Sequence, residues 1–213
     1  APDWAGKPRA GRAVSDGCLA TPTGSDGRYG FFSTKENPYV FIAPPEGYEV
    51  PLDGVFPQFW QALTADTSTR EEHNFTLTAA ENSSCVLLAL GDFHLCDRTA
   101  LYDLRQFRQQ TEELKTLVQT LRSQGRTVYG LTLGDMTWDI YWDGSSGLAN
   151  ANFDLTDYRD EINSDFSDCA FPVWQTIGNH DHDYAATGDW DTVIPYKQII
   201  GPTYYSFNAG GYH

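Results

Sequence analysis

Residues 86–94 read VLLALGDFH and lie near the start of the C-terminal part of the chain, residues 81–213. The first five residues form a continuous apolar run, which is typical of a parallel strand covered on both faces. Gly91 then allows a turn, and Asp92 and His94, two positions apart in an extended segment, project to the same side. A carboxylate and an imidazole therefore converge where α/β sheets place their chemistry. Taken alone, the triplet fits a turn aspartate and a surface histidine equally well.

Two further apolar segments also end in residues that can bind metals. Residues 128–139, VYGLTLGDMTWD, lead to Asp135, and residues 171–183, FPVWQTIGNHDHD, lead to Asn179, His180 and Asp181. Each residue also has an ordinary structural interpretation: the first could cap a helix, the second could occupy a turn, and the histidine could be a surface residue. Three strands that end in this way favour one shared metal site.

The segment between the first two strands predicts an amphipathic helix over 99–124. Its apolar residues recur at i, i+3, i+4 and i+7; they are Leu101, Leu104, Phe107, Leu114, Leu117, Val118 and Leu121. Gly125 stands where a left-handed residue ends many helices, and Arg126 begins the second strand. The right-handed crossover of this βαβ unit places both strand ends on one edge of the sheet.

The rest of this C-terminal part contains a predicted irregular loop over 139–153, a helix over 156–166 and a strand over 172–177. Several loop aromatics either build the wall of a substrate cleft or serve only in packing; they are Tyr141, Trp142, Tyr184 and Trp190.

Residues 1–80 have a different character, because glycine, proline and aromatic residues are frequent and no helical period persists. This composition predicts a small all-β domain with strands near 11–14 and 39–43 and glycine turns at 15–17 and 25–27. The boundary with the second domain, residues 81–213, is expected within 78–84. The aromatics of this domain either bind carbohydrate or a partner, or pack in the fold, which is the commoner role; they are Tyr48, Phe56, Phe59 and Trp60.

Composition narrows the classes of partner. The chain has 213 residues, 14 Lys+Arg against 29 Asp+Glu, and a formal charge of −15, which argues against nucleic acid as the main partner. Four cysteines without a CxxC spacing are interpreted as free or structural. No apolar run approaches the ~20 residues that cross a bilayer. The sequence begins at Ala1, so the absence of a leader is uninformative.

The motifs around Asp92 and His94, Gly134-Asp135 and Gly178-Asn-His-Asp181 resemble, in this order, the first three motifs of the calcineurin-like metallophosphoesterases. The N-terminal part resembles the carboxypeptidase-regulatory type of Ig-like module that precedes the catalytic domain in some bacterial secreted phosphoesterases. The resemblance implies a small Ig-like β-sandwich followed by the N-terminal part of a four-layer α/β/β/α domain. It also implies a location in the cell envelope, the periplasm or outside the cell.

The resemblance further implies hydrolysis of a phosphate-ester substrate by two divalent transition metal ions, Mn, Fe or Zn, with a bridging hydroxide as nucleophile. The implied ligands are Asp92 and His94 on the first metal, Asp135 as the bridge and Asn179 on the second. A shared carboxylate would screen the repulsion between two cations, and a mixed N/O set suits these metals better than Ca. His180 would assist the leaving oxygen, and Asp181 would orient its ring.

Some positions depart from the family pattern. Trp138 stands three residues after the GD pair, where the family often has an acidic residue or Asn, and Asp139 follows one step later without an assigned ligand role. His182 and Asp183 extend the third motif. Together with Trp138 they are candidates for the pocket lining, and a solvated acidic turn is the alternative for the pair.

The family's later lone His and GHxH motif are absent before His213. The sequence is therefore expected to be the N-terminal portion of a longer protein, with its own C-terminal segment as a partner. Apolar surface at Val86, Leu88 and Val173 would then be poorly covered, and the piece alone would aggregate or self-associate. The alternative function is a non-catalytic glycan- or protein-binding module with a structural or vestigial metal site. The oligomeric state stays open.

Overall fold

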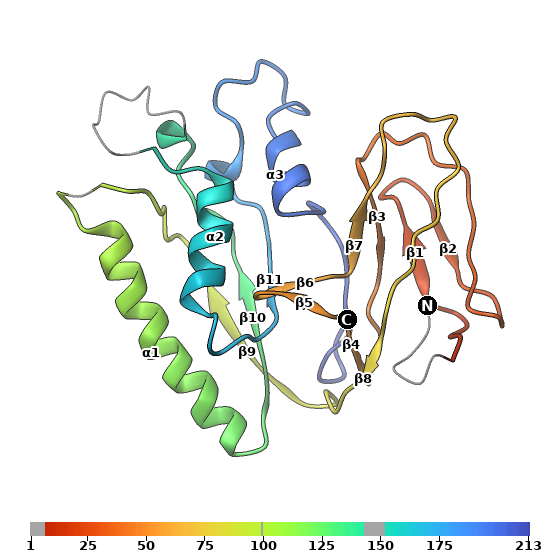
Figure 1. The fold of residues 1–213 in the computed structure, drawn as a ribbon, viewed down its shortest axis with the longest axis horizontal. Helices are drawn as coiled ribbons and strands as arrows, with labels where there is room; N and C mark the ends of the chain where they lie inside the picture. Colours follow the sequence, from red (N-terminus) through yellow and green to blue (C-terminus); the bar gives the residue numbers. More distant parts are fainter. Residues whose placement is uncertain (1–6, 99, 143–151) are drawn as a thin grey trace. The chain divides into compact units, whose positions relative to one another are not determined.

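The computed structural model describes residues 7–98, 100–142 and 152–213, which form two compact units (Figure 1). The first unit comprises residues 1–53, 57–85 and 204–213, and the second comprises 54–56 and 86–203. Thr99, the expected start of the first helix, and residues 143–151 of the predicted loop lie outside the described residues.

The first unit is an antiparallel β region. A four-stranded sheet has the order β2-β1-β3-β7 and consists of β1 (Ala13–Ser15), β2 (Ala20–Pro22), β3 (Tyr39–Ile42) and β7 (Trp60–Ala62). Two short pairs accompany it: β4 (Tyr48–Glu49) with β8 (Thr78–Ala79), and β5 (Leu52–Asp53) with β6 (Phe56–Pro57). The predicted turn glycines Gly17 and Gly27 have φ of 88° and 74°, which confirms that these turns need residues without a Cβ.

The aromatic residues singled out in the N-terminal domain take packing positions. Phe59 is buried, and its ring centroid lies 4.7 Å from that of Tyr205 within the first unit. The Tyr48 ring lies 4.8 Å from the Arg9 guanidinium. Phe56 is buried in the second unit, and Trp60 is half-buried in β7 of the first unit. These contacts support the packing interpretation over direct ligand binding by this group.

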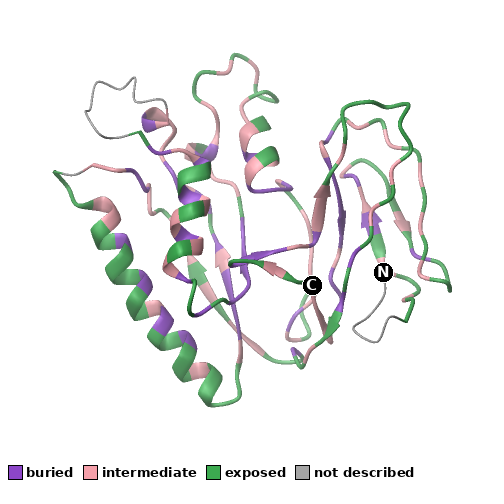
Figure 2. Ribbon diagram, viewed as in Figure 1, coloured by how far each residue is buried: buried purple, intermediate pink, exposed green. Residues whose placement is uncertain are grey.

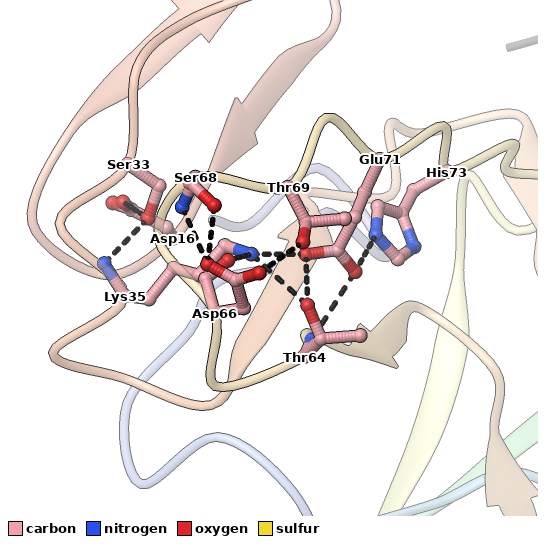
Figure 3. Close-up of polar contacts among 9 residues, drawn as sticks. All are labelled: Asp16, Ser33, Lys35, Thr64, Asp66, Ser68, Thr69, Glu71 and His73. Atoms are coloured by element: carbon pink, nitrogen blue, oxygen red, sulfur yellow. Dashed lines mark hydrogen bonds and ion pairs between the residues drawn. The ribbon is translucent and has the colours of Figure 1, made fainter.

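Lys35 and Glu71 form an ion pair that holds two loops of the first unit together (Figure 3). Their side chains are 7 % and 15 % exposed. Lys35 also donates to Thr64 Oγ1, and Glu71 accepts from the Thr64 amide and hydroxyl. The hydrogen bond from Lys35 lowers the pKa of Glu71 from 4.5 to about 2. The charged form of this carboxylate is therefore part of the folded loop structure.

This shift predicts acid sensitivity of the first unit. Because the pKa of Glu71 is lower in the folded than in the unfolded chain, the unfolded chain binds more protons between the two values. The stabilisation is complete above pH 4.5 and is lost as the pH falls toward about 2. Urea unfolding at stepped pH should show this loss, and Glu71→Gln should flatten it. The exposed Glu46→Gln is the control, and an unchanged pH profile in the Glu71 variant would contradict the assignment.

The second unit contains a parallel sheet with the order β11-β10-β9, formed by β9 (Cys85–Leu90), β10 (Thr127–Thr132) and β11 (Val173–Trp174). Its helices are α1 (Asp103–Ser123), α2 (Leu155–Asp165) and α3 (Ile194–Ile199), with short 3₁₀ turns η1 (Asp139–Tyr141) and η2 (Asn179–Asp181). α1 packs against β10 and α2, and α2 also packs against α3 (Figure 1). The third strand is shorter than predicted, and part of the predicted loop forms η1.

Helix α1 ends as predicted but begins later. Gly125 has φ of 75°, and the amides of Gly125 and Arg126 donate to the carbonyls of Arg122 and Leu121, which is a Schellman end. The predicted stripe is wrong at Leu101 and Leu117, which are 52 % and 44 % exposed. Figure 2 shows that much of α1 is exposed and that buried residues interrupt the exposed surface at intervals.

Two polar residues occupy the buried face of α1 instead. Thr111 donates to Asp165 at 2.9 Å, and Lys115 pairs with Asp168 at 3.1 Å. Both carboxylates come from α2 or the turn that follows it. The burial of these polar side chains is therefore tolerated because each has a partner on the neighbouring element.

Strand β9 is less buried than its apolar composition predicts. Leu87 is 49 % exposed, whereas Leu88 and Leu90 pack partly against the core. Exposure alternates along the strand, and alternate side chains point to opposite faces, so one face of β9 is covered more than the other. The expectation of a strand buried on both faces is wrong for this part of the chain. Val173 is fully buried, contrary to expectation, while Val86 is half-buried.

Candidate metal centre

Three of the predicted ligands have an unusual backbone conformation. Asp92, His94 and Asp135 have φ of 56°, 45° and 55°, in the left-handed region that side chains other than glycine rarely adopt. Each such residue costs on the order of 1–3 kcal/mol and persists only where the surrounding structure imposes it; such residues cluster at functional sites. The strain lies in the two loops that follow β9 and β10.

Backbone hydrogen bonds continue the sheet beyond the strand ends and impose this conformation. The Asp92 amide donates to the Gly134 carbonyl at 3.2 Å, and the His94 amide donates to the Asp135 carbonyl at 3.0 Å. A parallel bridge between Leu95 and Thr137 follows. The predicted juxtaposition of the first two motifs is thus present, and it is made by main-chain pairing.

The third motif approaches the second through two glycines. A Cβ on Gly134 would lie 2.6 Å from Gly178 Cα, and a Cβ on Gly178 would lie 2.2 Å from the Asp135 amide nitrogen. Gly134 also has φ of 90°. The His180 amide can therefore reach Asp135 Oδ1, to which it donates at 2.9 Å. Only glycine permits this contact between the two loops.

Gly178→Ala is expected to lower the free energy of unfolding by about 1–3 kcal/mol, as overpacking commonly does, because the Asp135 backbone must move away. Gly30→Ala is the matched control, since a Cβ there meets nothing within 4 Å. Urea unfolding of both variants makes the comparison. Equal stability of the two variants would show that the loops do not require this close approach.

The side chains of the first two motifs form a group able to hold a cation. The ligand atoms of Asp92, His94 and Asp135 all lie within 4.8 Å of one another. His94 Nε2 is 3.8 Å from Asp92 Oδ1 and from Asp135 Oδ2, which is too far for a hydrogen bond. Because metal–ligand bonds are about 2.0–2.2 Å long, two ligands of one ion can lie up to about 4 Å apart. The two separations from His94 Nε2, to Asp92 Oδ1 and to Asp135 Oδ2, fit this range.

The His94 ring also lacks the hydrogen bonds that usually orient a buried imidazole. Its Nδ1 is buried and has no hydrogen-bond partner within the described ranges of the chain. Two carboxylates face the other nitrogen at a distance that suits an intervening cation. The donor set, two carboxylate oxygens and one imidazole nitrogen, suits a divalent transition metal.

Asn179 lies beside this group but is exposed. It is the first residue of η2, between Gly178, whose backbone packs on Asp135, and His180, whose amide donates to that carboxylate. The structure therefore brings the third motif to Asp135, the residue expected to bridge two ions.

His180 is oriented by a carboxylate that the motif pattern did not indicate. Its Nδ1 lies 2.8 Å from Oδ1 of Asp139, whose side chain is 10 % exposed. Asp181, the expected partner, does not have this role. Asp139, to which the sequence analysis assigned no ligand role, contacts the ring because η1 turns it toward the third motif.

Asp181 instead joins the second and third motif loops. It is 1 % exposed and accepts from the Thr137 amide at 2.9 Å and the Thr137 hydroxyl at 3.0 Å. It also accepts from the amides of Met136 at 3.1 Å and Gly178 at 3.0 Å. A carboxylate that receives several backbone N–H groups fixes the loops that carry the candidate ligands.

Trp138 lies against both histidines of the site. Its ring centroid is 5.1 Å from that of His94 and 5.6 Å from that of His180, in edge-on arrangements. The Arg98 guanidinium lies 5.6 Å from the Trp138 ring and pairs with Asp103 at the start of α1. Trp138 is thus an apolar boundary of the site, held in place from the helix side.

Comparison with known protein families finds a match, which covers most of the first unit. Residues 3–80 match the family model described as the N terminal of Calcineurin-like phosphoesterase. Residues 3–80 are therefore an N-terminal domain of the calcineurin-like phosphoesterase type. The match ends before β9, so it does not cover the parallel sheet of the second unit. No curated protein and no solved structure matches the chain.

The remaining candidate residues of the second unit have local roles. His182 Nδ1 lies 2.9 Å from Thr192 Oγ1, and Asp183 accepts from the Ala185 amide at 2.9 Å. Both side chains therefore stabilise the loop after the third motif. None of the four cysteines, which all lie in the described ranges, forms a disulfide. In the described parts of the chain, no helix is long and apolar enough to cross a membrane.

Proposed function

We propose that the protein hydrolyses a phosphate ester at a dinuclear metal centre. The observation that carries the proposal is the convergence of Asp92, His94 and Asp135, all in the left-handed conformation, at the ends of adjacent parallel strands. The N-terminal family match supports the reaction class. Asp92 and His94 would hold the first ion, Asp135 would be shared between the two ions, and Asn179 would serve the second.

The chain's own residues then have distinct tasks. When bound, divalent ions such as Mn, Fe or Zn supply Lewis acidity, which polarises phosphoryl oxygens and activates water as the nucleophile. His180 donates a proton to the leaving oxygen through Nε2, because Nδ1 is occupied by Asp139. Asp139 fixes the orientation of the ring through its contact with Nδ1. Trp138 keeps water from the side of the two histidines.

Several finer expectations belong to the same proposal. They are an Ig-like sandwich over residues 1–80, a catalytic domain that begins at residue 81, and a complete four-layer α/β/β/α architecture for that domain. The antiparallel region and the parallel sheet are compatible with these expectations. We also propose that the protein acts in the cell envelope, the periplasm or outside the cell.

Metal dependence tests the proposed function. Residues 1–213 and any longer natural chain that contains them should be stripped with a chelator and titrated with Mn, Fe or Zn. Calorimetry should detect binding, and hydrolysis of an aryl phosphate should depend on the added ion. Absence of both metal binding and metal-dependent hydrolysis in the longest natural chain would contradict the proposal.

A further inference from the structure

The first unit contains a large cavity separate from the residues of the candidate metal centre. Its volume is about 1100 Å³, and its lining comes from residues 26–35 and 63–75, with contributions from Pro8 and Val40. Small-molecule sites in proteins typically measure roughly 300–1,000 Å³. The cavity can therefore accept a ligand larger than a single sugar or nucleoside.

Aromatic rings line part of this cavity. Tyr29 lies between Phe31 and Phe75, with ring centroids 6.3 Å and 6.4 Å away and interplanar angles of 31° and 35°. Phe32 also lines the cavity, and it is 97 % exposed. A ligand that covers this exposed phenyl ring would remove apolar surface from water, which favours binding. These rings offer flat apolar surfaces to a ligand.

Several polar residues of the lining are held by hydrogen bonds and ion pairs to one another (Figure 3). Lys35 and Glu71 neutralise each other, and Glu71 also contacts His73 Nε2 at 3.3 Å. His73 Nδ1 lies 3.0 Å from Gln61 Oε1, and the Tyr29 hydroxyl donates to the His73 carbonyl at 2.7 Å. Preorganised groups of this kind reduce the entropic cost of binding.

The charges around the cavity are balanced. The lining carries cations Arg28, Lys35 and Arg70 and anions Asp26, Glu71 and Glu72. A strongly charged ligand therefore gains no net attraction there, although the whole chain has a formal charge of −15. The combination of flat apolar rings, fixed polar groups and no excess charge fits a ligand with apolar ring faces and many neutral hydroxyl groups.

We propose that this cavity binds a neutral oligosaccharide, with sugar ring faces against the aromatic rings and hydroxyl groups toward the polar lining. Phe32 is the outer contact surface, and Tyr29 and Phe31 form the inner one. The site is independent of the proposed phosphoesterase activity, because its lining lies wholly in the first unit. It also differs from the aromatic group that the sequence first suggested for carbohydrate binding.

The test uses defined neutral hexasaccharides of glucose, mannose and N-acetylglucosamine, measured by calorimetry on residues 1–213. At least one should bind, and Phe32→Ala should weaken it roughly two- to tenfold, the loss expected for one aromatic contact. Folding of this variant is not at risk, because the side chain is almost fully exposed. Trp190→Ala, 84 % exposed in the second unit, is the matched control and should leave binding unchanged.

Three results would overturn the proposal. They are no binding of any neutral hexasaccharide, binding that Phe32→Ala leaves unchanged, and tighter binding of a polyanionic hexasaccharide such as oligogalacturonate. Binding of gelatin that depends on Phe32 in the absence of sugar binding would assign the cavity to a polypeptide instead. Loss of metal binding in a separate Asp135 variant should not change sugar affinity, so the two proposals can fail independently.

Discussion

Replacing Asp135 with asparagine is expected to remove most hydrolytic activity and much of the bound metal. Asp135, in the second motif, contacts both other motifs: Oδ2 faces His94 at 3.8 Å, and Oδ1 accepts from the His180 amide at 2.9 Å. The substitution removes a negative charge at the point where both proposed ions need one, while the amide keeps nearly the same shape. Elemental analysis and turnover of an aryl phosphate measure the two losses.

The matched control is Asp160→Asn, which changes an exposed aspartate on α2 of the same unit. It should keep the parent's metal content and turnover, which shows that one lost charge in this acidic chain is not the cause. Full metal content with full activity in the Asp135 variant would rule out its bridging role. Loss of activity with full metal content would place the residue in chemistry rather than in metal binding.

His180→Ala is expected to lower turnover by about 10²–10⁴-fold, the usual contribution of a positioned general acid. The metal content should stay near that of the parent, because the proposed ligand set does not include this imidazole. The loss should be larger for alkyl than for aryl phosphates, since an alkoxide leaving group needs the proton more. Equal losses for both substrate types would argue against proton donation.

Asp139→Asn separates orientation from proton transfer in the same experiment. The amide can still contact His180 Nδ1 but carries no charge. We therefore expect a smaller loss of turnover than in His180→Ala, with the metal content near that of the parent. Asp181→Asn should instead lower stability, because Asp181 joins the second and third motif loops. A loss of turnover at unchanged stability in the Asp181 variant, with full turnover in the Asp139 variant, would show that Asp181 orients the ring.

The order of elements was predictable because its signals are local. A continuous apolar run predicts a buried or half-buried strand, and the helix end at Gly125 depends on one backbone conformation that glycine favours. The three polar clusters also follow their strands directly in the sequence. Parallel pairing then requires that their ends share one edge of the sheet. The group of Asp92, His94 and Asp135 could therefore be predicted without coordinates.

Other properties depend on contacts between segments far apart in the chain. In the sequence Asp181 adjoins His180 and Asp139 lies 41 residues away, and only the packing of η1 against the third motif decides that Asp139 reaches the ring while Asp181 turns inward. The exposure of Leu87 depends on which face of β9 the rest of the fold covers, and the burial of Lys115 depends on its partner Asp168. Residue type and spacing thus determined which ligands and elements the protein has, because these are properties of local chain geometry. Tertiary structure alone decided which side chain faces which, since that choice depends on the relative placement of loops that the sequence separates by more than 40 residues.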